Sequence, residues 1–358
     1  MSEKTVYYPD CRYFKGYIPC RPHKEHGYHC ETCPEYSKIK KKILIIKLGA
    51  IGDVIRTTPL LTRLWKDEPE AEIWWLTYSP DIVPERVDKV MDFTLENITT
   101  LRNVKFDLII NLDKDYQACA LASEIPSDDT WGFMLINGRP APANKNAEHK
   151  FLTGLFDDVN KANTKNYLEE IFEICGLEFR GEEYLLDVDD SIEWNIPNEG
   201  KKIIGLNTGC GARWISRLWD NRYWIELIEM LQAADYFPML LGGSQEDENN
   251  KYLHQQTGAY YPGHFTLREF ISLMNQTDGI VSAVTMGMHL AIGLKKPLIL
   301  MNNIFNPNEF ELYGRGEIVQ PEKECKCFFS PKCTNEEYHC MDYLRPQAIF
   351  DAIERNVK

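Results

Sequence analysis

The chain has 358 residues, of which 44% are hydrophobic and 26% charged, and its 54 acidic and 40 basic side chains give a formal net charge of −14 at pH 7. At roughly 100–200 residues per domain, this length predicts two domains. The acidic balance argues against nucleic acid as a partner, because sequence-independent binding depends on Lys and Arg neutralising phosphates. The apolar runs are far shorter than the ~20 residues that span a bilayer, and the N-terminus lacks the apolar core of a signal peptide, so we expect a cytoplasmic protein.

Residues 1–41 are interpreted as a small Cys- and His-rich extension. Residues 1–42 hold nine basic and five acidic side chains, a net charge of +4, so the rest of the chain carries −18. The segment has six tyrosines but little apolar periodicity, and it could not build a hydrophobic core unaided. A metal ion could staple so short a segment. The candidate ligands are Cys11, Cys20, Cys30 and Cys33.

Residues 42–180 alternate between strand and helix patterns and predict a doubly wound first domain. A continuous apolar run over residues 43–48 has the length of a buried strand, the next five residues form a glycine turn, and residues 54–65 have helical spacing of apolar positions. We predict further strands at 72–77, 106–112 and 131–135, and an amphipathic helix at 166–175.

An acidic, poorly periodic stretch at residues 181–200 is interpreted as a linker, and a second βα series follows over residues 201–358. Its predicted strands are 202–206, 239–241, 279–282 and 297–301, and its predicted helices are 223–233, 267–275, 286–294 and 346–355. The fold class is therefore α/β, with two Rossmann-like, doubly wound domains that face a cleft. This is the GT-B architecture, although repeated βα units also fit other two-domain enzymes.

The segment from Ile45 to Pro59, IIKLGAIGDVIRTTP, closely resembles the opening signature of glycosyltransferase family nine, the ADP-heptose heptosyltransferases of lipopolysaccharide assembly. Gly49 and Gly52 let a backbone turn lie close to a ligand, and the turn places Asp53 at the start of a helix. The resemblance implies that Asp53 is the general base on the acceptor hydroxyl. Judged from the local pattern alone, Asp53 could instead cap the helix.

A second motif resembles the loop of that family that binds the nucleotide diphosphate: residues 205–211, GLNTGCG, followed by Arg217-Leu218-Trp219. Glycines after a strand expose backbone N–H groups, and a cation that reaches the diphosphate stabilises it as a leaving group. Arg217 is the predicted cation, at a position where the family commonly has Lys. The alternative for Arg217 is a solvated surface charge. The loop residues predicted to bind the donor are Thr208, Gly209 and Gly211.

Two further segments resemble parts of the family's nucleotide site. In residues 240–246, LLGGSQE, Gly243 follows a strand and Glu246 matches the carboxylate that hydrogen-bonds the donor ribose, with Gln245 as the alternative. In residues 262–267, PGHFTL, Thr266 and Leu267 match the stretch that holds the adenine. Thr266 would also cap the following helix.

The chain departs from the family pattern at residues 282–290, SAVTMGMHL. Val284 stands where the family usually has Asp, and Met286 stands where it has Gly, whereas Thr285 and His289 match. The missing carboxylate affects the identity of the transferred sugar more than the type of reaction. His289 is predicted either to position a phosphate or sugar oxygen or to be a satisfied structural histidine.

A second group of cysteines lies near the C-terminus with the spacing Cys-x-Cys-x5-Cys-x6-Cys, and it loosely resembles the iron finger of bacterial autotransporter heptosyltransferases. Four thiolates suit zinc, iron or an iron–sulfur cluster, and such a closed set favours a structural over a catalytic role. The alternative, for either group, is reduced thiols without a metal. These residues are Cys325, Cys327, Cys333 and Cys340.

The sequence thus predicts an inverting glycosyltransferase that moves a sugar, by resemblance a heptose, from a nucleotide-diphospho-sugar such as ADP-heptose to a lipopolysaccharide core or other surface glycan. Catalysis would need no cofactor, and the predicted metals are structural. The basic extension would let the enzyme contact phosphorylated glycolipid at the inner membrane. Two alternatives stay open: a nucleotide-binding metal-cluster protein without transferase activity, and a protein O-glycosyltransferase of the same family. A nicotinamide dehydrogenase fits less well, because the first glycine of the dinucleotide fingerprint is missing.

Overall fold

The computed structural model describes residues 6–211 and 213–358. Contacts divide the chain into two units, the first comprising Met1–Leu48 and Leu60–Ala147 and the second Gly49–Pro59 and Glu148–Lys358. This division differs from the predicted boundaries at 180 and 200. The glycine turn with Asp53, and residues 148–180, group with the second unit, although they lie in the part of the sequence assigned to the first domain.

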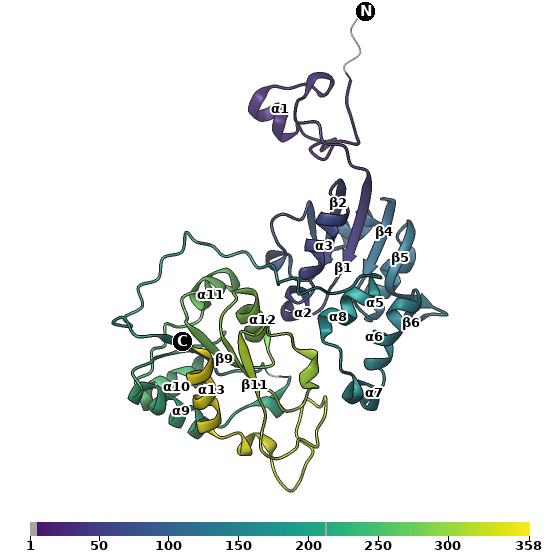
Figure 1. The fold of residues 1–358 in the computed structure, drawn as a ribbon. Coiled ribbons are helices and arrows are strands. Elements are labelled where there is room, and N and C mark those ends of the chain that lie inside the picture. The colour runs from purple at the N-terminus through teal and green to yellow at the C-terminus, as the bar shows by residue number, and fades with distance from the viewer. Residues whose placement is uncertain (1–5, 212) are drawn as a thin grey trace, which may run out of the picture. The chain divides into compact units, whose positions relative to one another are not determined.

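The first unit is built on a six-stranded sheet with the order β3-β2-β1-β4-β5-β6 (Figure 1). Strands β1 to β5 pair in parallel, and β6 pairs antiparallel with β5. The apolar run predicted at 43–48 is buried as part of β1, and the strands predicted at 72–77, 106–112 and 131–135 are confirmed as β2, β4 and β5. The strand bounds are β1 Lys41–Ile46, β2 Ala71–Thr77, β3 Lys89–Asp92, β4 Phe106–Asn111, β5 Ser127–Ile136 and β6 Arg139–Pro142.

The first unit has three helices between its strands, and the sequence analysis did not predict two of them. The residues of β1 and β4 form a buried cluster with apolar side chains of α5, including Ala118 and Leu121. Helix α5 is short and rich in alanine, so its apolar positions show only weak helical periodicity. The helices are α3 Pro59–Asp67, α4 Leu95–Leu101 and α5 Tyr116–Glu124.

The N-terminal extension has its own local structure, with a short helix α1 (Arg21–His26) and a 3₁₀ turn η1 (Cys30–Thr32). Pro22 is the buried residue of α1, while Tyr17 and Ile18 are exposed. This agrees with the prediction that the segment has almost no hydrophobic core of its own.

The second unit is built on a parallel sheet with the order β11-β10-β9-β7-β8. In this sheet β7 comes first in the chain, and β8 lies on one side of it. Strands β9, β10 and β11 follow on the other side, so the winding reverses between β7 and β9. In open α/β sheets, ligands bind outside the carboxyl ends of the strands at such a reversal. The bounds are β7 Ile203–Asn207, β8 Phe237–Leu241, β9 Gly279–Ala283, β10 Leu298–Met301 and β11 Gly316–Val319.

Helices connect these strands, and the four helices predicted in this part of the chain are confirmed. The C-terminal helix α13 packs against α9, and both contribute to one buried cluster with β7, β9 and β10 (Figure 1). Helix α10, which is strongly polar, was not predicted. The bounds are α9 Asn221–Ala233, α10 Asp247–Thr257, α11 Leu267–Met274, α12 Met286–Gly293 and α13 Pro346–Asn356.

Four helices from the first half of the sequence also belong to the second unit, and α2 packs against α12. The single helix predicted over residues 54–65 is wrong, because the segment forms α2 and α3 with a break between them. The hydroxyls of Thr57 and Thr58 donate to the carbonyls of Val54 and Ile55, and Pro59 has no N–H to continue α2. The bounds are α2 Ile51–Ile55, α6 Glu148–Thr153, α7 Asp157–Ala162 and α8 Tyr167–Ile174. None of the helices among the described residues combines the length and the apolar character needed to span a membrane.

Candidate active site

The second unit contains a cavity of about 700 Å³ at the carboxyl ends of β7 and β9, a volume typical of ligand sites. Its walls come from α2, from the loops after β7, β8 and β9, and from residues 305–329. Ten of the residues predicted for the site lie on this wall. They are Gly52, Asp53, Gly209, Gly211, Arg217, Gly243, Glu246, Leu267, Thr285 and His289.

Asp53 lies in the first turn of α2 with about a third of its side chain exposed. The N-cap of this helix is Ala50, so Asp53 is not the capping residue. Its Oδ1 lies 2.7 Å from Nη2 of Arg56, one turn further along the helix. The carboxylate is therefore oriented by an ion pair at the cavity wall.

Arg56 also reaches across to the other side of the cavity. Its Nη1 donates to Oε1 of Glu309 at 3.0 Å, and its guanidinium lies 3.4 Å from the centre of the Tyr167 ring. Burial on its own would lower the pKa of Arg56, but the negative charges of Asp53 and Glu309 oppose it and hold that pKa above its ordinary value. Arg56 is thus a permanent cation shared between two carboxylates.

His289 is buried on α12 and packs directly against α2. A Cβ at Gly52 would lie 2.4 Å from Cδ2 of His289, so only glycine fits at residue 52. Burial, together with the nearby Arg56 charge, lowers the pKa of His289 to about 3. Its Nδ1 lies 3.5 Å from the hydroxyl of Tyr184. These surroundings make His289 a neutral, packed residue at neutral pH, whose ring also lines the cavity.

Arg217 is buried with only 7% of its surface exposed, so the alternative of a solvated surface charge is wrong. Its Nη2 donates to the carbonyl of Cys210 at 3.1 Å, and its Nε has no hydrogen-bond partner among residues 6–211 and 213–358. Burial lowers the pKa of Arg217 to about 10. The guanidinium lies 5.6 Å from the Trp214 ring and 5.5 Å from the Phe305 ring. A desolvated cation with an unsatisfied N–H at a cavity wall is suited to bind an anion.

Glu246 is fixed beside the two glycine loops. Its Oε2 accepts a hydrogen bond from the backbone N–H of Gly243 at 3.0 Å. A Cβ at Gly209 would lie 2.1 Å from Oε1 of Glu246, so the glycine leaves room for this carboxylate. Thr208 does not share this position: its buried hydroxyl donates to Oδ1 of Asn250 at 2.6 Å, and it is not among the described residues that line the cavity.

The two predicted threonines at helix starts have structural roles. Thr285 caps α12 by accepting from the N–H of Gly287 at 3.1 Å, and Thr266 forms a capping box with Glu269 at the start of α11. Thr285 lines the cavity, but Thr266 and Gly49 are not among the described residues that do so. The neighbours of Thr266, Phe265 and Leu267, are on the wall and supply apolar surface.

An aromatic group on the cavity wall was missed by the sequence analysis. Phe305 lies 5.7 Å from Trp214 and 5.3 Å from Phe329, ring centre to ring centre, and 6.4 Å from Phe310. The residues come from the loop after β7 and from the chain after β10, and no short motif joins them. Glu309 was missed for the same reason.

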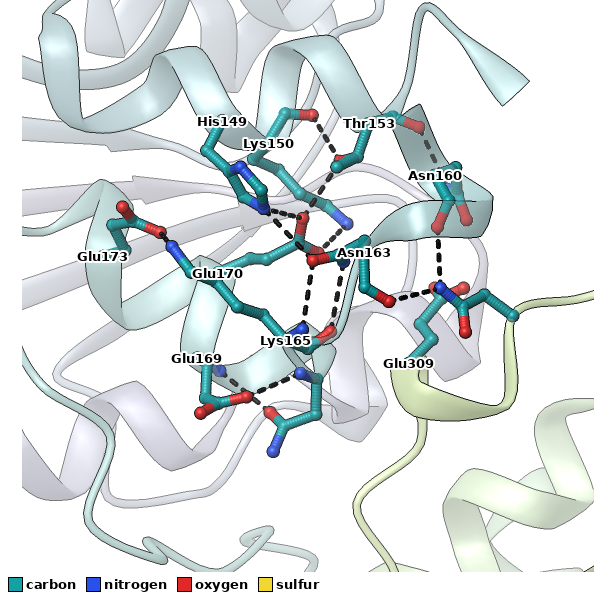
Figure 2. Close-up of polar contacts among 12 residues, drawn as sticks. His149, Lys150, Thr153, Asn160, Asn163, Lys165, Glu169, Glu170, Glu173 and Glu309 are labelled. Atoms are coloured by element: carbon teal, nitrogen blue, oxygen red, sulfur yellow. Dashed lines mark hydrogen bonds and ion pairs between the residues drawn. The ribbon is translucent and has the colours of Figure 1, made fainter. Parts of the chain in front are cut away.

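A buried polar network lies beside Glu309 and joins α6, α7 and α8 (Figure 2). Glu170 has 1% of its side chain exposed, and its two oxygens lie 2.5 Å from Nζ of Lys150 and 2.9 Å from the hydroxyl of Thr153. On the other side of the network, Nδ2 of Asn306 donates to the carbonyls of Asn160 and Asn163 at 2.6 and 2.7 Å. Asn306 in turn caps the 3₁₀ turn η5 (Pro307–Glu309) that carries Glu309.

The eight predicted metal-binding cysteines form two separate groups in the structure, and all are free thiols. Near the C-terminus, Sγ of Cys327 and Cys333 lie 3.5 Å apart, and the thiols of Cys325 and Cys340 interact with each other. In the extension, four cysteines line one cavity of about 20 Å³, namely Cys11, Cys20, Cys30 and Cys33. Within the described residues, no group of three or more His, Cys, Asp or Glu side chains already has the arrangement of a metal site.

Comparison with known proteins places this fold in a class. The family model described as glycosyltransferase family 9 (heptosyltransferase) matches residues 165–339, and no curated protein matches the chain. A glycosyltransferase family 9 structure from Veillonella parvula has a TM-score of 0.67 and 17% identity, covering 89% of this chain and 97% of its own. The ADP-heptose lipopolysaccharide heptosyltransferase II of Escherichia coli has a TM-score of 0.63 and 17% identity, covering 88% of this chain and 98% of its own. The dodecameric iron-containing heptosyltransferase TibC of enterotoxigenic E. coli, in complex with ADP-D-β-D-heptose, has a TM-score of 0.58 and 13% identity, covering 89% of this chain and 77% of its own.

The likeness to these structures confirms the predicted fold class, an α/β GT-B protein with two parallel-sheet domains. The protein is a glycosyltransferase. It carries a glycosyltransferase family 9 (heptosyltransferase) domain, as its opening signature predicted. The matched residues all lie in the second unit, which also holds the cavity.

Proposed function

We propose that this glycosyltransferase moves a heptose, with inversion, from ADP-heptose to a hydroxyl of a lipopolysaccharide core or other surface glycan. The observation that carries the proposal is Arg217, a buried cation with an unsatisfied N–H beside the glycine loop. A diphosphate would supply the missing anionic acceptor. The heptosyltransferase neighbours, one of them in complex with ADP-D-β-D-heptose, support the choice of donor.

The reaction needs a base, and Asp53 is the carboxylate on the cavity wall that matches the signature. Asp53 takes the proton of the acceptor hydroxyl while that oxygen forms a bond to the anomeric carbon. The bond between the anomeric carbon and the phosphate oxygen breaks, and ADP leaves with the electron pair. Arg217 and the N–H groups of the Gly209 to Gly211 loop stabilise the charge that develops on the diphosphate.

The remaining wall has features suited to the nucleoside part of the donor. Leu267 and the rings of Phe265 and Phe270 offer an apolar surface for the base, and the fixed Glu246 carboxylate can accept from the ribose hydroxyls. No catalytic cofactor enters these steps. Val284 leaves the donor-sugar side without the family's usual Asp, so a deoxy-sugar or other heptose analogue is the alternative donor to test.

Replacing Asp53 tests the proposal most directly. Asp53→Ala should abolish sugar transfer from ADP-heptose, measured as the release of ADP. Binding of ADP itself, measured by calorimetric titration, should persist. A donor-binding screen over ADP-, GDP-, UDP- and TDP-sugars with the wild type should select the ADP-sugar. Unchanged turnover in the variant would remove Asp53 from the mechanism, and selection of another nucleotide would overturn the donor assignment.

We also propose a structural metal ion at each cysteine group. The C-terminal donor set fits, because four thiols lie together and backbone N–H groups already point at sulfur: that of Cys327 lies 3.4 Å from Sγ of Cys325 and that of Thr334 lies 3.1 Å from Sγ of Cys327. The N-terminal set fits because four thiols share one cavity with room for about a single water-sized sphere. Zinc and iron both suit such thiolate sets.

The extension supports a further proposal, contact with phosphorylated glycolipid at the membrane surface. It carries a net charge of +3 over residues 1–41 and exposes Tyr7, Tyr17 and Ile18. Removing residues 1–40 should weaken activity on an anionic acceptor more than on a neutral fragment, and should reduce binding to vesicles that contain anionic lipid. An equal loss on both acceptors would point to a role in folding instead.

A further inference from the structure

Asp53 and Glu309 lie on either side of one guanidinium, that of Arg56. Nη2 of Arg56 lies 2.7 Å from the Asp53 carboxylate, and Nη1 donates to Glu309 at 3.0 Å. The two carboxylates come from α2 and from the turn after β10, so only the folded unit brings them to the same cation. We propose that Glu309 and Arg56 are positioning residues for the base: Arg56 orients the Asp53 carboxylate, and Glu309 draws part of the Arg56 charge away so that Asp53 keeps its affinity for a proton.

The need for the second carboxylate follows from electrostatics. A cation in contact with a carboxylate favours its charged form and so weakens it as a base. A second carboxylate on the same guanidinium takes up hydrogen-bonding capacity and adds a negative charge nearby, and both effects oppose that weakening. The side chains involved are well shielded, with 16% of Arg56 and 17% of Glu309 exposed, so water screens the charges only partly.

The other titratable groups that face Asp53, Arg56 and Glu309 do not change the net charge of this cluster. His289, from α12, is neutral because its pKa is lowered to about 3. The hydroxyl of Tyr184 is neutral at physiological pH, because burial raises its pKa above the ordinary value of a tyrosine. Lys150 lies 4.6 Å from the Tyr167 ring centre, but it is already paired with the buried Glu170.

The surrounding structure holds Glu309 in place. Its N–H donates to the carbonyl of Asn306 at 3.1 Å, and Nδ2 of Asn306 donates to the carbonyls of Asn160 in α7 and of Asn163 directly after α7. Asn308 adds a bond from its Nδ2 to the carbonyl of Asn163 at 3.2 Å. The Arg56 guanidinium is held from another direction by the Tyr167 ring. A residue that acts through Arg56 needs to be held in place in this way.

The inference rests on the proposed role of Asp53, and the pH profile of ADP release from ADP-heptose, with water as acceptor, tests it. In Glu309→Gln the acidic limb should move to lower pH by about one unit, and the plateau rate should fall about tenfold. In Arg56→Met the acidic limb should move to higher pH. Glu309→Asp, which keeps the charge, should hold the limb near its wild-type position. The apparent KM for the donor should stay within about twofold in all three variants.

Glu183→Gln is the matched control, because Glu183 pairs with Arg315 at 2.7 Å in the same unit but neither residue is on the cavity wall. It should leave the limb unmoved. Activity losses in the Arg56 and Glu309 variants without opposite shifts of the limb would overturn the inference and leave a purely structural role.

The failure of the proposed function gives a different result. If Asp53→Asn still releases ADP at the wild-type rate, the base assignment fails, and the positioning role fails with it. If the wild type releases no ADP from this donor, only the donor assignment fails. Thermal unfolding of the variants then tests the positioning role. Asp53→Asn and Glu309→Gln should shift the melting midpoint non-additively, because both act on Arg56. Additive shifts would overturn the inference.

Discussion

The His289 ring occupies the space that any side chain at residue 52 would need, with Cδ2 2.4 Å from the position of a Cβ. The pair holds α2 against α12 and thereby places Asp53 at the cavity. The second glycine of the signature is thus explained by packing against a buried histidine, in addition to the close approach of a ligand.

Gly52→Ala should therefore destabilise the second unit by about 1–3 kcal/mol and reduce transfer, because the new methyl group must displace the packed His289 ring. Chemical denaturation and initial rates measure the two effects. Gly52→Ala combined with His289→Ala should recover part of the lost stability. Gly243→Ala is the control, since its Cβ would lie 3.6 Å from Glu246, an ordinary contact, and it should change stability by less than about 0.5 kcal/mol. Equal losses in both single variants would contradict the packing argument.

His289 should also make the protein sensitive to mild acid. Its pKa is lowered to about 3 in the folded protein, whereas an unfolded histidine titrates near 6.5. Between these values the unfolded chain binds more protons, so stability falls as the pH drops below about 6.5, by up to about 1.4 kcal/mol per pH unit. In His289→Gln the melting midpoint should depend less on pH between 7 and 5. The control His26→Gln, at an exposed histidine, should keep the wild-type pH dependence of the melting midpoint. If His289→Gln keeps that dependence too, the inference that His289 is buried in its neutral form is wrong.

Arg217→Met should weaken ADP binding by about 10- to 100-fold, because charge-assisted hydrogen bonds to the diphosphate are lost. The fold should tolerate the change, since a buried, partly unsatisfied cation is replaced by an apolar side chain of similar length. Arg217→Lys should bind with intermediate affinity, because it keeps the charge but not the fork geometry. Isothermal titration with ADP measures this, and the exposed Arg213→Met in the same loop is the comparison. An effect from Arg213 as large as that from Arg217 would argue against a specific phosphate contact.

The buried Glu170 should be important for the stability of the second unit. Glu170→Ala would remove a buried carboxylate that pairs with Lys150 and accepts a hydrogen bond from Thr153, and we expect a loss of about 3–5 kcal/mol in the free energy of unfolding. Glu173→Ala, on the same helix, breaks a pair with Lys165 of the same 2.5 Å length, but that pair is about 40% exposed and should contribute at most about 1 kcal/mol. Similar losses of stability in the two variants would show that burial does not determine how much each ion pair contributes.

The two cysteine groups should hold about one metal ion each, measured by elemental analysis of the purified protein. Cys333→Ser should remove the ion of the C-terminal group and Cys33→Ser that of the extension, and each variant should keep the other ion. His26→Ala, which changes a histidine outside the N-terminal cavity, should keep both. Intact disulfides in the native protein, seen as a mass deficit, or unchanged metal content in both cysteine variants would contradict the proposal.

The sequence predicted those parts of the fold that depend on local pattern. The continuous apolar run of β1 and the alternation of strands and helices in the second unit predicted an α/β protein with doubly wound domains, whereas the motifs favoured GT-B over other two-domain enzymes. The prediction of a single helix over residues 54–65 failed because the apolar periodicity continues across Thr57, Thr58 and Pro59. At these residues the threonine hydroxyls bond to backbone carbonyls and Pro59 lacks an N–H, so α2 ends.

The candidate site was predicted where its residues lie in short motifs, and missed where they do not. Arg217 was identified from its loop, but the burial that distinguishes it from a surface arginine comes from Trp214 and Phe305, which the motif does not join. Glu309 is 253 residues away from Arg56 along the chain, so nothing local could link them. Thr208 lies in a motif but turns to Asn250, because a buried hydroxyl needs a partner.

The grouping of Gly49–Pro59 with the second unit has a consequence for building hybrids from two enzymes of this kind. A single exchange point near residue 148 would combine the proposed donor pocket of one parent with α2 from the other. The grafted helix would then meet a foreign counterpart of His289 and a foreign counterpart of Glu309. A hybrid intended to transplant donor choice should therefore exchange two pieces of chain, the short Gly49–Pro59 segment and everything from Glu148 onward.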